Sequence, residues 1–280
     1  PAEGPSADPA PAVSTPAQPE DGSASFTDSV GRTVEVPAEI TSVAVSGPLA
    51  QMVLFALCPD KLVGIADEWD ASAEQYLATE YYNLPLLGQL YGGKGELNLE
   101  TLLGSGAQVV IDVGEPKDTI VEDLDALQEQ TGIPFVHVSA TIETMGDAYR
   151  KLGELLGMED RGKELSDYCK AAYDETVSVM GKIPESERAN VAYLLGDKGT
   201  NTIAKDSYQG QVVDLVANNV AELGEVSGSG AGVEISMEQL ALWNPQVILF
   251  AENSIYDTVG SDAAFADLDA VKSGTYYEVP

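Results

Sequence analysis

The chain has 280 residues, of which 44% are hydrophobic and 21% charged, enough apolar material for one large or two smaller packed domains. Its 46 acidic and 14 basic residues give a net charge of -32, so its surface repels nucleic acids and anionic membranes. One histidine and two cysteines argue against imidazole-cluster metal sites, thiolate cages and disulfide scaffolds.

Residues 1–25 are dominated by Pro, Ala, Ser and acidic residues, and none of them is aromatic. This composition buries too little apolar surface to offset the entropy lost on ordering, so the segment is predicted to be a disordered, extended tether. The alternative is a frayed terminus. The chain starts at Pro1 without a basic-then-apolar leader, so any secretion signal is expected to have been removed. No stretch reaches the roughly 18 apolar residues of a spanning helix, so membrane contact is expected only through the tether.

From Phe26 the chain is predicted to alternate between strands and helices. An extended arm comes first, and apolar strands follow at residues 40–45, 62–66, 109–113 and 135–138. Helices are predicted at residues 49–57, 72–82, from 98 onward and at 120–131. Nearly all-apolar strands that alternate with helices indicate a parallel sheet covered on both faces. His137, in the last strand, is interpreted as a core or strand-end histidine rather than a ligand.

Two further helices are predicted at residues 141–156 and 159–181, separated at Gly157. The second is long and carries an apolar stripe; Pro184 ends it, and a new strand-helix series begins at Ala189. The sequence therefore predicts an α/β fold of two Rossmann-like lobes with parallel sheets. The lobes are residues 26–158 and 184–280, and one long rigid helix in residues 159–183 joins them.

An internal repeat supports the two-lobe prediction. Residues 98–111 (NLETLLGSGAQVVI) match residues 236–249 (SMEQLALWNPQVIL) without a gap. Each copy opens with a good N-cap residue, Asn98 or Ser236, and carries a glutamate two positions later, Glu100 or Glu238. Each copy then places a glutamine before an apolar strand. Two copies of one helix-strand unit, on either side of the long helix, indicate two similar lobes.

The residue patterns of common enzymes are missing. There is no Gly-x-Ser-x-Gly nucleophile elbow, and residues 93–95 lack the Ser or Thr and the glycine spacing of a phosphate loop. Residues 228–232 are interpreted as a flexible turn rather than a dinucleotide fingerprint. Cys58 and Cys169 lie in helical patterns and are interpreted as buried thiols rather than a redox pair. A binding protein without resident cofactor fits these absences better than an enzyme.

Ligands of open α/β sheets bind outside the carboxyl ends of the strands, so the cleft between two lobes is the expected site. Aromatic residues in the loops there could stack on a bulky ligand, or tyrosine phenolates could bind iron. Scarce cations in the same loops could instead offset an anionic ligand. Ordinary loop packing and solvated surface charges are the alternatives. The predicted ligand-binding residues are Trp69, Tyr91, Lys94, Lys117, Lys198, Tyr208 and Glu252.

Several segments together resemble the class III substrate-binding proteins of ABC importers. They are residues 28–37 (DSVGRTVEVP), 55–65 (FALCPDKLVGI), 98–100 (NLE), 131–134 (TGIP), 236–240 with Asn244-Pro245, and 268–280. The resemblance spans Phe26 to Pro280. Members of that family usually continue beyond the position of Pro280, so the second lobe is expected to be truncated or short. Cys58 stands where a small residue such as glycine is usual.

The resemblance implies an extracytoplasmic, monomeric solute-binding protein that closes around its ligand and performs no chemistry. It is expected to be a tethered lipoprotein or periplasmic, and to deliver its ligand to an ABC permease dimer with its ATPase. A small-molecule iron complex, a ferric siderophore or haem, is the first choice of ligand. Cobalamin is second, and molybdate or tungstate third because of the three lysines. An enzyme on a nitrogenase-like scaffold would need more cysteines, and a ligand-free surface protein is the remaining rival.

Glu100 and Glu238 have two possible roles. An acidic residue in the first turn of a helix stabilises that helix through the dipole, which by itself accounts for either glutamate. The resemblance adds a second role, because glutamates at these motif positions of the family meet arginines of the two permease subunits. Glu100 and Glu238 are therefore predicted to dock the permease, one from each lobe.

Overall fold

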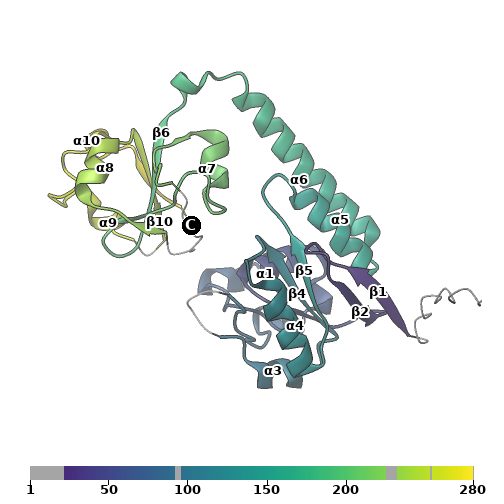
Figure 1. The fold of residues 1–280 in the computed structure, drawn as a ribbon. Helices are drawn as coiled ribbons and strands as arrows, with labels where there is room; N and C mark the ends of the chain where they lie inside the picture. Colours follow the sequence, from purple (N-terminus) through teal and green to yellow (C-terminus); the bar gives the residue numbers. More distant parts are fainter. Residues whose placement is uncertain (1–21, 92–95, 225–231, 253, 280) are drawn as a thin grey trace, which may run out of the picture.

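The structure, a computed structural model, describes residues 22–91, 96–224, 232–252 and 254–279 (Figure 1). It opens with an antiparallel hairpin of β1 (Ser23–Thr27) and β2 (Thr33–Pro37), in which Ser23 pairs with Pro37. The predicted tether boundary at residue 25 is therefore wrong, since a regular strand already begins at Ser23. The prediction of disorder for residues 23–25 rests on their polar and small side chains, but a β-ladder forms through backbone hydrogen bonds, which any side chain permits. The remainder of the predicted tether, residues 1–21, lies outside the described residues.

The first lobe is built on a parallel sheet in the order β3-β4-β5: β3 (Val43–Val45), β4 (Val109–Gly114) and β5 (Phe135–Ser139). One face packs on α1 (Pro48–Leu57), through residues such as Val45, Leu54 and Ile111. The other face packs on α3 (Leu99–Gly104) and α4 (Ile120–Thr131), through Val110 and Leu124. The predicted double cover of a parallel sheet is confirmed.

Two predicted elements of this lobe differ in the structure. Residues 62–66 make only isolated bridges, Val43 with Leu62 and Ile65 with Leu86, after the short turn η1 (Pro59–Lys61). The predicted helix at 72–82 is split into η2 (Ala71–Gln75) and α2 (Thr79–Tyr82). Neither short helix buries a residue, so no apolar face holds the two turns together.

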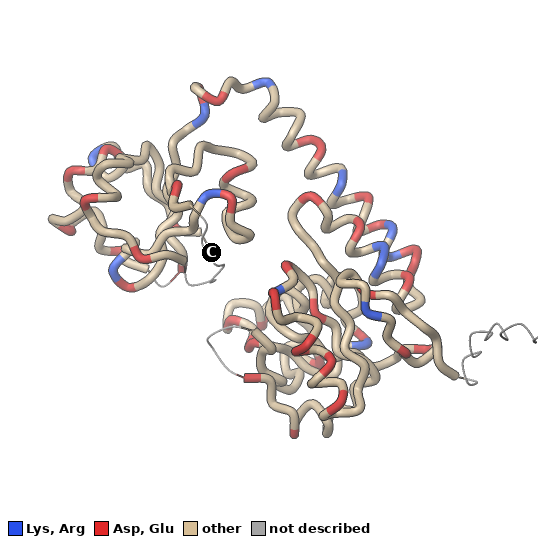
Figure 2. Tube along the Cα trace, in the orientation of Figure 1, with Lys and Arg blue, Asp and Glu red and all other residues tan. Residues whose placement is uncertain are grey.

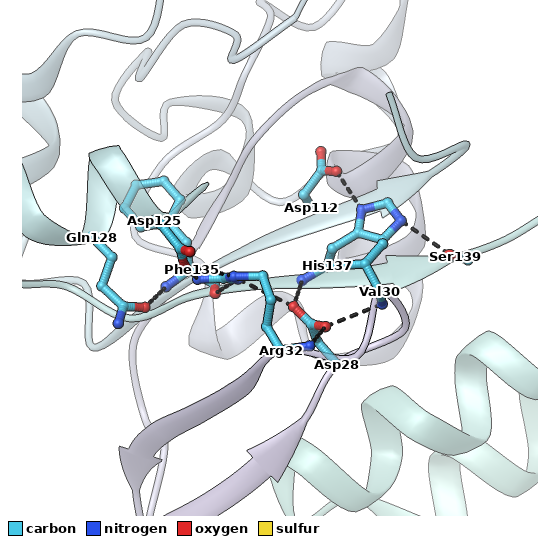
Figure 3. A network of polar contacts seen from close by, with 9 residues as sticks. All are labelled: Asp28, Val30, Arg32, Asp112, Asp125, Gln128, Phe135, His137 and Ser139. Atoms are coloured by element: carbon cyan, nitrogen blue, oxygen red, sulfur yellow. Dashed lines mark hydrogen bonds and ion pairs between the residues drawn. The ribbon is translucent and has the colours of Figure 1, made fainter. Parts of the chain in front are cut away.

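An ion pair within the arm that precedes the sheet positions Arg32, which fastens the arm to β5 by a hydrogen bond (Figure 3). Asp28, whose side chain is fully buried, accepts hydrogen bonds from the backbone of Val30 and Arg32 and pairs with the Arg32 guanidinium at 3.1 Å. Arg32 also donates to the Phe135 carbonyl at 2.8 Å and pairs with Asp125 of α4. The Asp-x-x-Gly-Arg segment is thus a structural clamp between arm and sheet.

Helices α5 (Met145–Leu156) and α6 (Glu159–Met180) lie side by side and lead out of the first lobe (Figure 1). Gly157 ends α5 in the left-handed conformation at φ 63°, where the sequence predicts the break. Gly153 and Gly162 bring the two backbones together, because a Cβ atom at Gly162 would lie 2.7 Å from the Tyr149 carbonyl oxygen. The 22 residues of α6 are about 33 Å long and connect the two lobes.

The second lobe holds one sheet in the order β11-β10-β6-β7-β9, with β8 also paired to β6. Its strands are β6 (Asn190–Leu195), β7 (Asn201–Thr202), β8 (Asn218–Asn219), β9 (Val233–Glu234), β10 (Val247–Ala251) and β11 (Tyr276–Val279). Strands β6, β8, β10 and β11 run parallel, as predicted. Strands β7 and β9 pair antiparallel, so an all-parallel second sheet is wrong. The link from β6 to β7 is too short for a crossover helix, and Gly196 and Gly199 turn it at positive φ.

Short helices accompany this sheet. They are η3 (Glu185–Glu187), α7 (Gln211–Val216), α8 (Met237–Trp243), α9 (Tyr256–Val259) and α10 (Asp269–Ser273). Leu194, Phe250 and Leu240 are fully buried in the core of this lobe. That core is separate from those of the first lobe, so each lobe has its own apolar centre.

The sequence repeat is also a structural repeat. Asn98 accepts a hydrogen bond from the Thr101 N–H at 3.0 Å, and Ser236 accepts one from the Gln239 N–H at 3.1 Å. The side-chain oxygen of Gln108 accepts hydrogen bonds from the backbone N–H groups of Thr41 and Ser42, just before β3. The side-chain oxygen of Gln246 accepts one from the backbone N–H of Asn190, the first residue of β6. The two units therefore cap their helices and register their strands in the same way.

Both cysteines are free, as predicted. Cys58, the C-cap residue of α1, is buried, and burial raises the pKa of its thiol to about 12. Cys169 of α6 is half-buried, and burial raises its pKa too. Neither thiol has the lowered pKa of a reactive cysteine.

Candidate ligand-binding cleft

A pocket of about 220 Å³ opens where the first lobe's strands end and the second lobe approaches them. The loop after β3 contributes Ser46, and the end of β4 and the loop after it contribute Asp112, Glu115 and Lys117. The second lobe contributes Tyr208 and Gln209, and other lining residues are Gly47, Pro48, Leu49, Ala50, Tyr91, Val113 and Gly114. The pocket lies at the carboxyl ends of parallel strands, where the fold class predicts a ligand site.

Tyr208 is the aromatic residue that links the two lobes. Its hydroxyl donates to the Ala140 carbonyl at 2.7 Å, and the Ile142 N–H donates to the Gln211 side chain nearby at 2.9 Å. Gly114 makes room for it: a Cβ atom there would lie 3.4 Å from the Tyr208 hydroxyl, at a φ of +137° that side chains rarely adopt. Tyr208 therefore lies directly against the end of β4.

A second, more apolar pocket of about 430 Å³ lies on the other side of Tyr208, against α6 and α7. It shares Leu49, Tyr208 and Gln209 with the first pocket. Its other lining residues are Thr141, Ile142, Met145, Tyr168, Cys169, Ala172, Tyr173, Thr176, Gln211, Val212 and Leu215. The two pockets adjoin at these shared residues, Tyr208 among them, and together are called the hollow.

The floor of the first pocket is polar. The Asp112 carboxylate accepts a hydrogen bond from the Ser46 hydroxyl and lies 2.6 Å from Nδ1 of His137 (Figure 3). Nε2 of His137 lies 3.1 Å from the Ser139 hydroxyl. His137 is fully buried, which agrees with the core position predicted for it, whereas 13% of the Asp112 side chain is exposed to the pocket.

The two tyrosines of the first pocket are protonated phenols. Burial, the hydrogen bond to Asp123 and the charges of Asp123 and Asp112 all raise the pKa of Tyr91. Burial, and then the charges of Glu115 and Asp112, raise the pKa of Tyr208. The nearby carboxylates therefore oppose ionisation of both phenols.

The structure brings some of the predicted ligand-binding residues together and separates others. Tyr91, Lys117 and Tyr208 line the same pocket. Trp69 packs on Phe55 with ring centroids 5.2 Å apart and donates to the Tyr81 carbonyl, in an aromatic cluster that lines neither pocket. Lys198 lines a different pocket, of about 290 Å³ beside β7 and β9, and Glu252 is exposed after β10. Lys94 lies outside the described residues.

Acidic residues dominate both lobes, and several of the scarce basic ones lie on α5 and α6 (Figure 2). In the first pocket Lys117 is paired with Glu115 at 3.8 Å, so its charge is already offset. Asp112 adds a further carboxylate, and the described lining of this pocket carries a net negative charge.

Sequence reasoning missed Asp112 as a site residue. It lies inside a strand that reads as core, and its histidine partner is 25 residues further along the chain. The available signal was one carboxylate within an otherwise apolar strand, next to a strand that carries the chain's only histidine.

Glu100 and Glu238 are both exposed, each in the first turn of its helix. Neither makes an ion pair among those found in the described part of the chain. Both carboxylates are therefore available to a partner.

The profile of the periplasmic binding protein family matches residues 58–280. The chain belongs to the periplasmic binding protein family. Its structure is similar to an ABC transporter solute binding protein from Sulfurospirillum deleyianum, with a TM-score of 0.81 and 27% identity over 91% of this chain and 80% of that one. A search of curated proteins found no match.

Two more distant structures share the fold. The molybdate periplasmic binding protein MolA of Haemophilus influenzae, bound to molybdate, has a TM-score of 0.73 and 19% identity over 92% of this chain and 83% of that one. The haem-binding protein HmuT has a TM-score of 0.66 and 17% identity over 96% of this chain and 85% of that one.

This periplasmic binding protein is the solute-binding component of an ABC transporter and not an enzyme. It works outside the cytoplasm with permease and ATPase components. Among the described residues, no helix is both long and apolar enough to cross a membrane. The predicted α/β, two-lobe fold and the predicted family are confirmed.

Proposed function

We propose that the protein captures an iron complex, a ferric siderophore or haem, in the hollow between its lobes. The observation that carries the proposal is Tyr208, an aromatic side chain of the second lobe that lies against the strand ends of the first, between two pockets. Tyr91, Tyr168 and Tyr173 add further rings around the same hollow. Aromatic rings favour large, partly apolar ligands on which they can stack.

The side chains available to bind a metal in the described residues also favour a metal that arrives already chelated. No group of three or more His, Cys, Asp or Glu side chains in that part of the chain could hold a metal ion. A chelated iron brings its own ligands and requires only contacts to the chelator. A bare zinc or manganese ion would need such a group from the protein.

Cobalamin, molybdate and tungstate remain the alternatives. The oxyanions are the weaker ones, because Lys117 is paired with Glu115 and Asp112 leaves the pocket negative. Cobalamin shares the requirement for a large, aromatic-lined hollow, and direct titration separates it from an iron complex.

We expect Tyr208→Ala to weaken binding of the iron complex by about 1 kcal/mol or more, roughly fivefold, since the truncation removes a ring that lines both pockets. Calorimetric titration with ferrioxamine, haemin and cobalamin measures it. Tyr76→Ala is the matched control, because Tyr76 is 81% exposed and lines neither pocket. Equal affinities of the parent and Tyr208→Ala would contradict this placement of the site.

We further propose that Glu100 and Glu238 dock a permease dimer and that the protein acts as a monomer. The matched exposure of the two glutamates in the repeated units supports the docking role. The composition of residues 1–25 supports a tether to the outer face of the membrane as a lipoprotein.

A further inference from the structure

Residues 204–210 form a tight loop in the second lobe, and Tyr208 lies within it. The Ser207 hydroxyl donates to the Ala204 carbonyl at 2.6 Å and accepts from the Gly210 N–H at 3.1 Å. The loop is so closely folded that a Cβ atom at Gly210 would lie 2.6 Å from the Ala204 carbonyl oxygen. The loop is therefore a fixed base for the Tyr208 side chain.

Gln211, the first residue of α7, connects this loop to the first lobe through both ends of its side-chain amide. Its Oε1 accepts from the Ile142 N–H at 2.9 Å, and its Nε2 donates to the Tyr208 carbonyl at 2.8 Å. The two partners define the orientation of the amide, because a backbone N–H can only donate and a backbone carbonyl can only accept. Gln211 therefore satisfies one backbone group in each lobe.

The first-lobe side of this contact is ordered as well. Just before α5, the Thr141 N–H donates to the Thr144 hydroxyl at 2.9 Å, and the Thr144 N–H donates to the Thr141 hydroxyl at 3.2 Å. This reciprocal pair fixes the turn that contains Ile142. The Ala140 carbonyl, which accepts from the Tyr208 hydroxyl at 2.7 Å, directly precedes the same turn. Both hydrogen bonds from the second lobe thus end on one ordered segment of the first.

The two hydrogen bonds between the lobes join positions that are far apart in the chain. Tyr208 is 68 residues from Ala140. Gln211 is 69 residues from Ile142, with α5 and α6 in between. Helix α7 also packs against α6, but the apolar pocket of about 430 Å³ lies against both helices, and Tyr168 of α6 at that pocket is 74% exposed. The helix contact by itself therefore leaves the lobes room to move.

We propose that Gln211 is a positioning residue, which together with Tyr208 forms a clasp that holds the two lobes in one arrangement before a ligand enters. The clasp consists of the Gln211–Ile142 and Tyr208–Ala140 hydrogen bonds. It also keeps the Tyr208 ring where it lines both pockets, and this part rests on the proposed function. Because apparent affinity scales with the fraction of molecules in the binding-competent arrangement, the clasp raises affinity by ordering the lobes in advance.

Distance measurements on the full, ligand-free protein test the clasp. Glu122 of α4 and Glu278 of β11 are exposed, one in each lobe, and replacing each by p-acetylphenylalanine allows spin labelling that leaves both cysteines in place. Pulsed electron double resonance should give one narrow distance distribution in the parent. In Gln211→Leu, whose side chain has no hydrogen-bonding atom, the distribution should become about twofold wider or more.

Two further variants separate the clasp from a general loss of folding. Tyr208→Phe keeps the ring and removes only the hydroxyl donor, so it should also widen the distribution. Gln239→Leu is the matched control: it makes the same replacement in α8 of the second lobe, outside both pockets, and should leave the distribution as in the parent. Circular dichroism should show the same helix content in all four proteins.

The same variants test the effect on binding. Calorimetric titration with ferrioxamine and haemin should show that Gln211→Leu weakens the complex that the parent binds, about twofold or more, by the factor by which its clasped fraction falls. A side chain that only stabilised α7 would lower the melting temperature and leave this affinity at the parent value.

The failures are distinguishable. A distribution that stays narrow in both Gln211→Leu and Tyr208→Phe overturns the clasp, and the packing of α7 on α6 then holds the lobes. A wider distribution with unchanged affinity overturns the positioning role. If the parent binds neither ferrioxamine nor haemin, the proposed function is overturned, and the ligand-free distances still decide whether the clasp exists.

Discussion

Replacing Glu100 and Glu238 together by glutamine should reduce uptake by tenfold or more, while ligand affinity stays at the parent value. Both side chains are exposed, and neither lines either of the two pockets. They lie at the same position of the two structural repeats, one in each lobe, with α6 between the lobes. Loss of an interfacial charge pair costs about 2 kcal/mol or more, so removing two should nearly abolish productive docking.

Binding of the variant to its permease in proteoliposomes, and transport of labelled iron complex, measure this effect. The parent should bind more weakly as salt is added, and the double variant should show a smaller salt dependence. Glu122→Gln with Glu278→Gln is the matched control, since it removes one exposed glutamate from each lobe. If the double variant transports as well as the control, the glutamates stabilise their helices only, by a few tenths of a kcal/mol to about 1 kcal/mol.

Asp28→Asn should destabilise the protein by about 3 kcal/mol, because it breaks a buried ion pair and leaves Arg32 facing a neutral amide. The Asp28 side chain is fully buried and that of Arg32 is 8% exposed, so water cannot replace the lost partner. Urea unfolding followed by circular dichroism measures the change in the free energy of unfolding.

Asp125→Asn is the control for this pair. Asp125 contacts the same guanidinium but is 62% exposed, and loss of an exposed pair costs at most about 1 kcal/mol. Similar stabilities of Asp28→Asn and the parent would mean that the arm is not clamped to β5 in solution.

Much of the first lobe could be predicted because its apolar pattern and its structure agree. Helix α4 occupies the predicted residues, and the break at Gly157 is where a left-handed cap is needed. The repeat could be recognised because the cap residue and the glutamine each make the same hydrogen bond in both copies, and a glutamate stands at the same position between them. These are local interactions, and local interactions leave a local sequence pattern.

The second sheet and the site could be predicted only in part. Strands β7 and β9 contain two residues each, too few for any periodicity to appear. Tyr91, Tyr208 and Trp69 are all aromatic residues in predicted loops, so the sequence does not distinguish them. Tyr91 and Tyr208 line the first pocket, whereas Trp69 packs on Phe55. The partner of Asp112 is fixed by strand pairing, which the chain order of the residues does not reveal.

Native mass spectrometry of the protein purified from its own host tests the central claim most directly. The account predicts one bound small molecule per chain, with the isotope pattern and mass of an iron complex, and a lower fraction of ligand-bound protein for Tyr208→Ala under the same conditions. A protein that carries an iron-free oxyanion such as molybdate, or that carries no small molecule after growth with every candidate ligand, would contradict it.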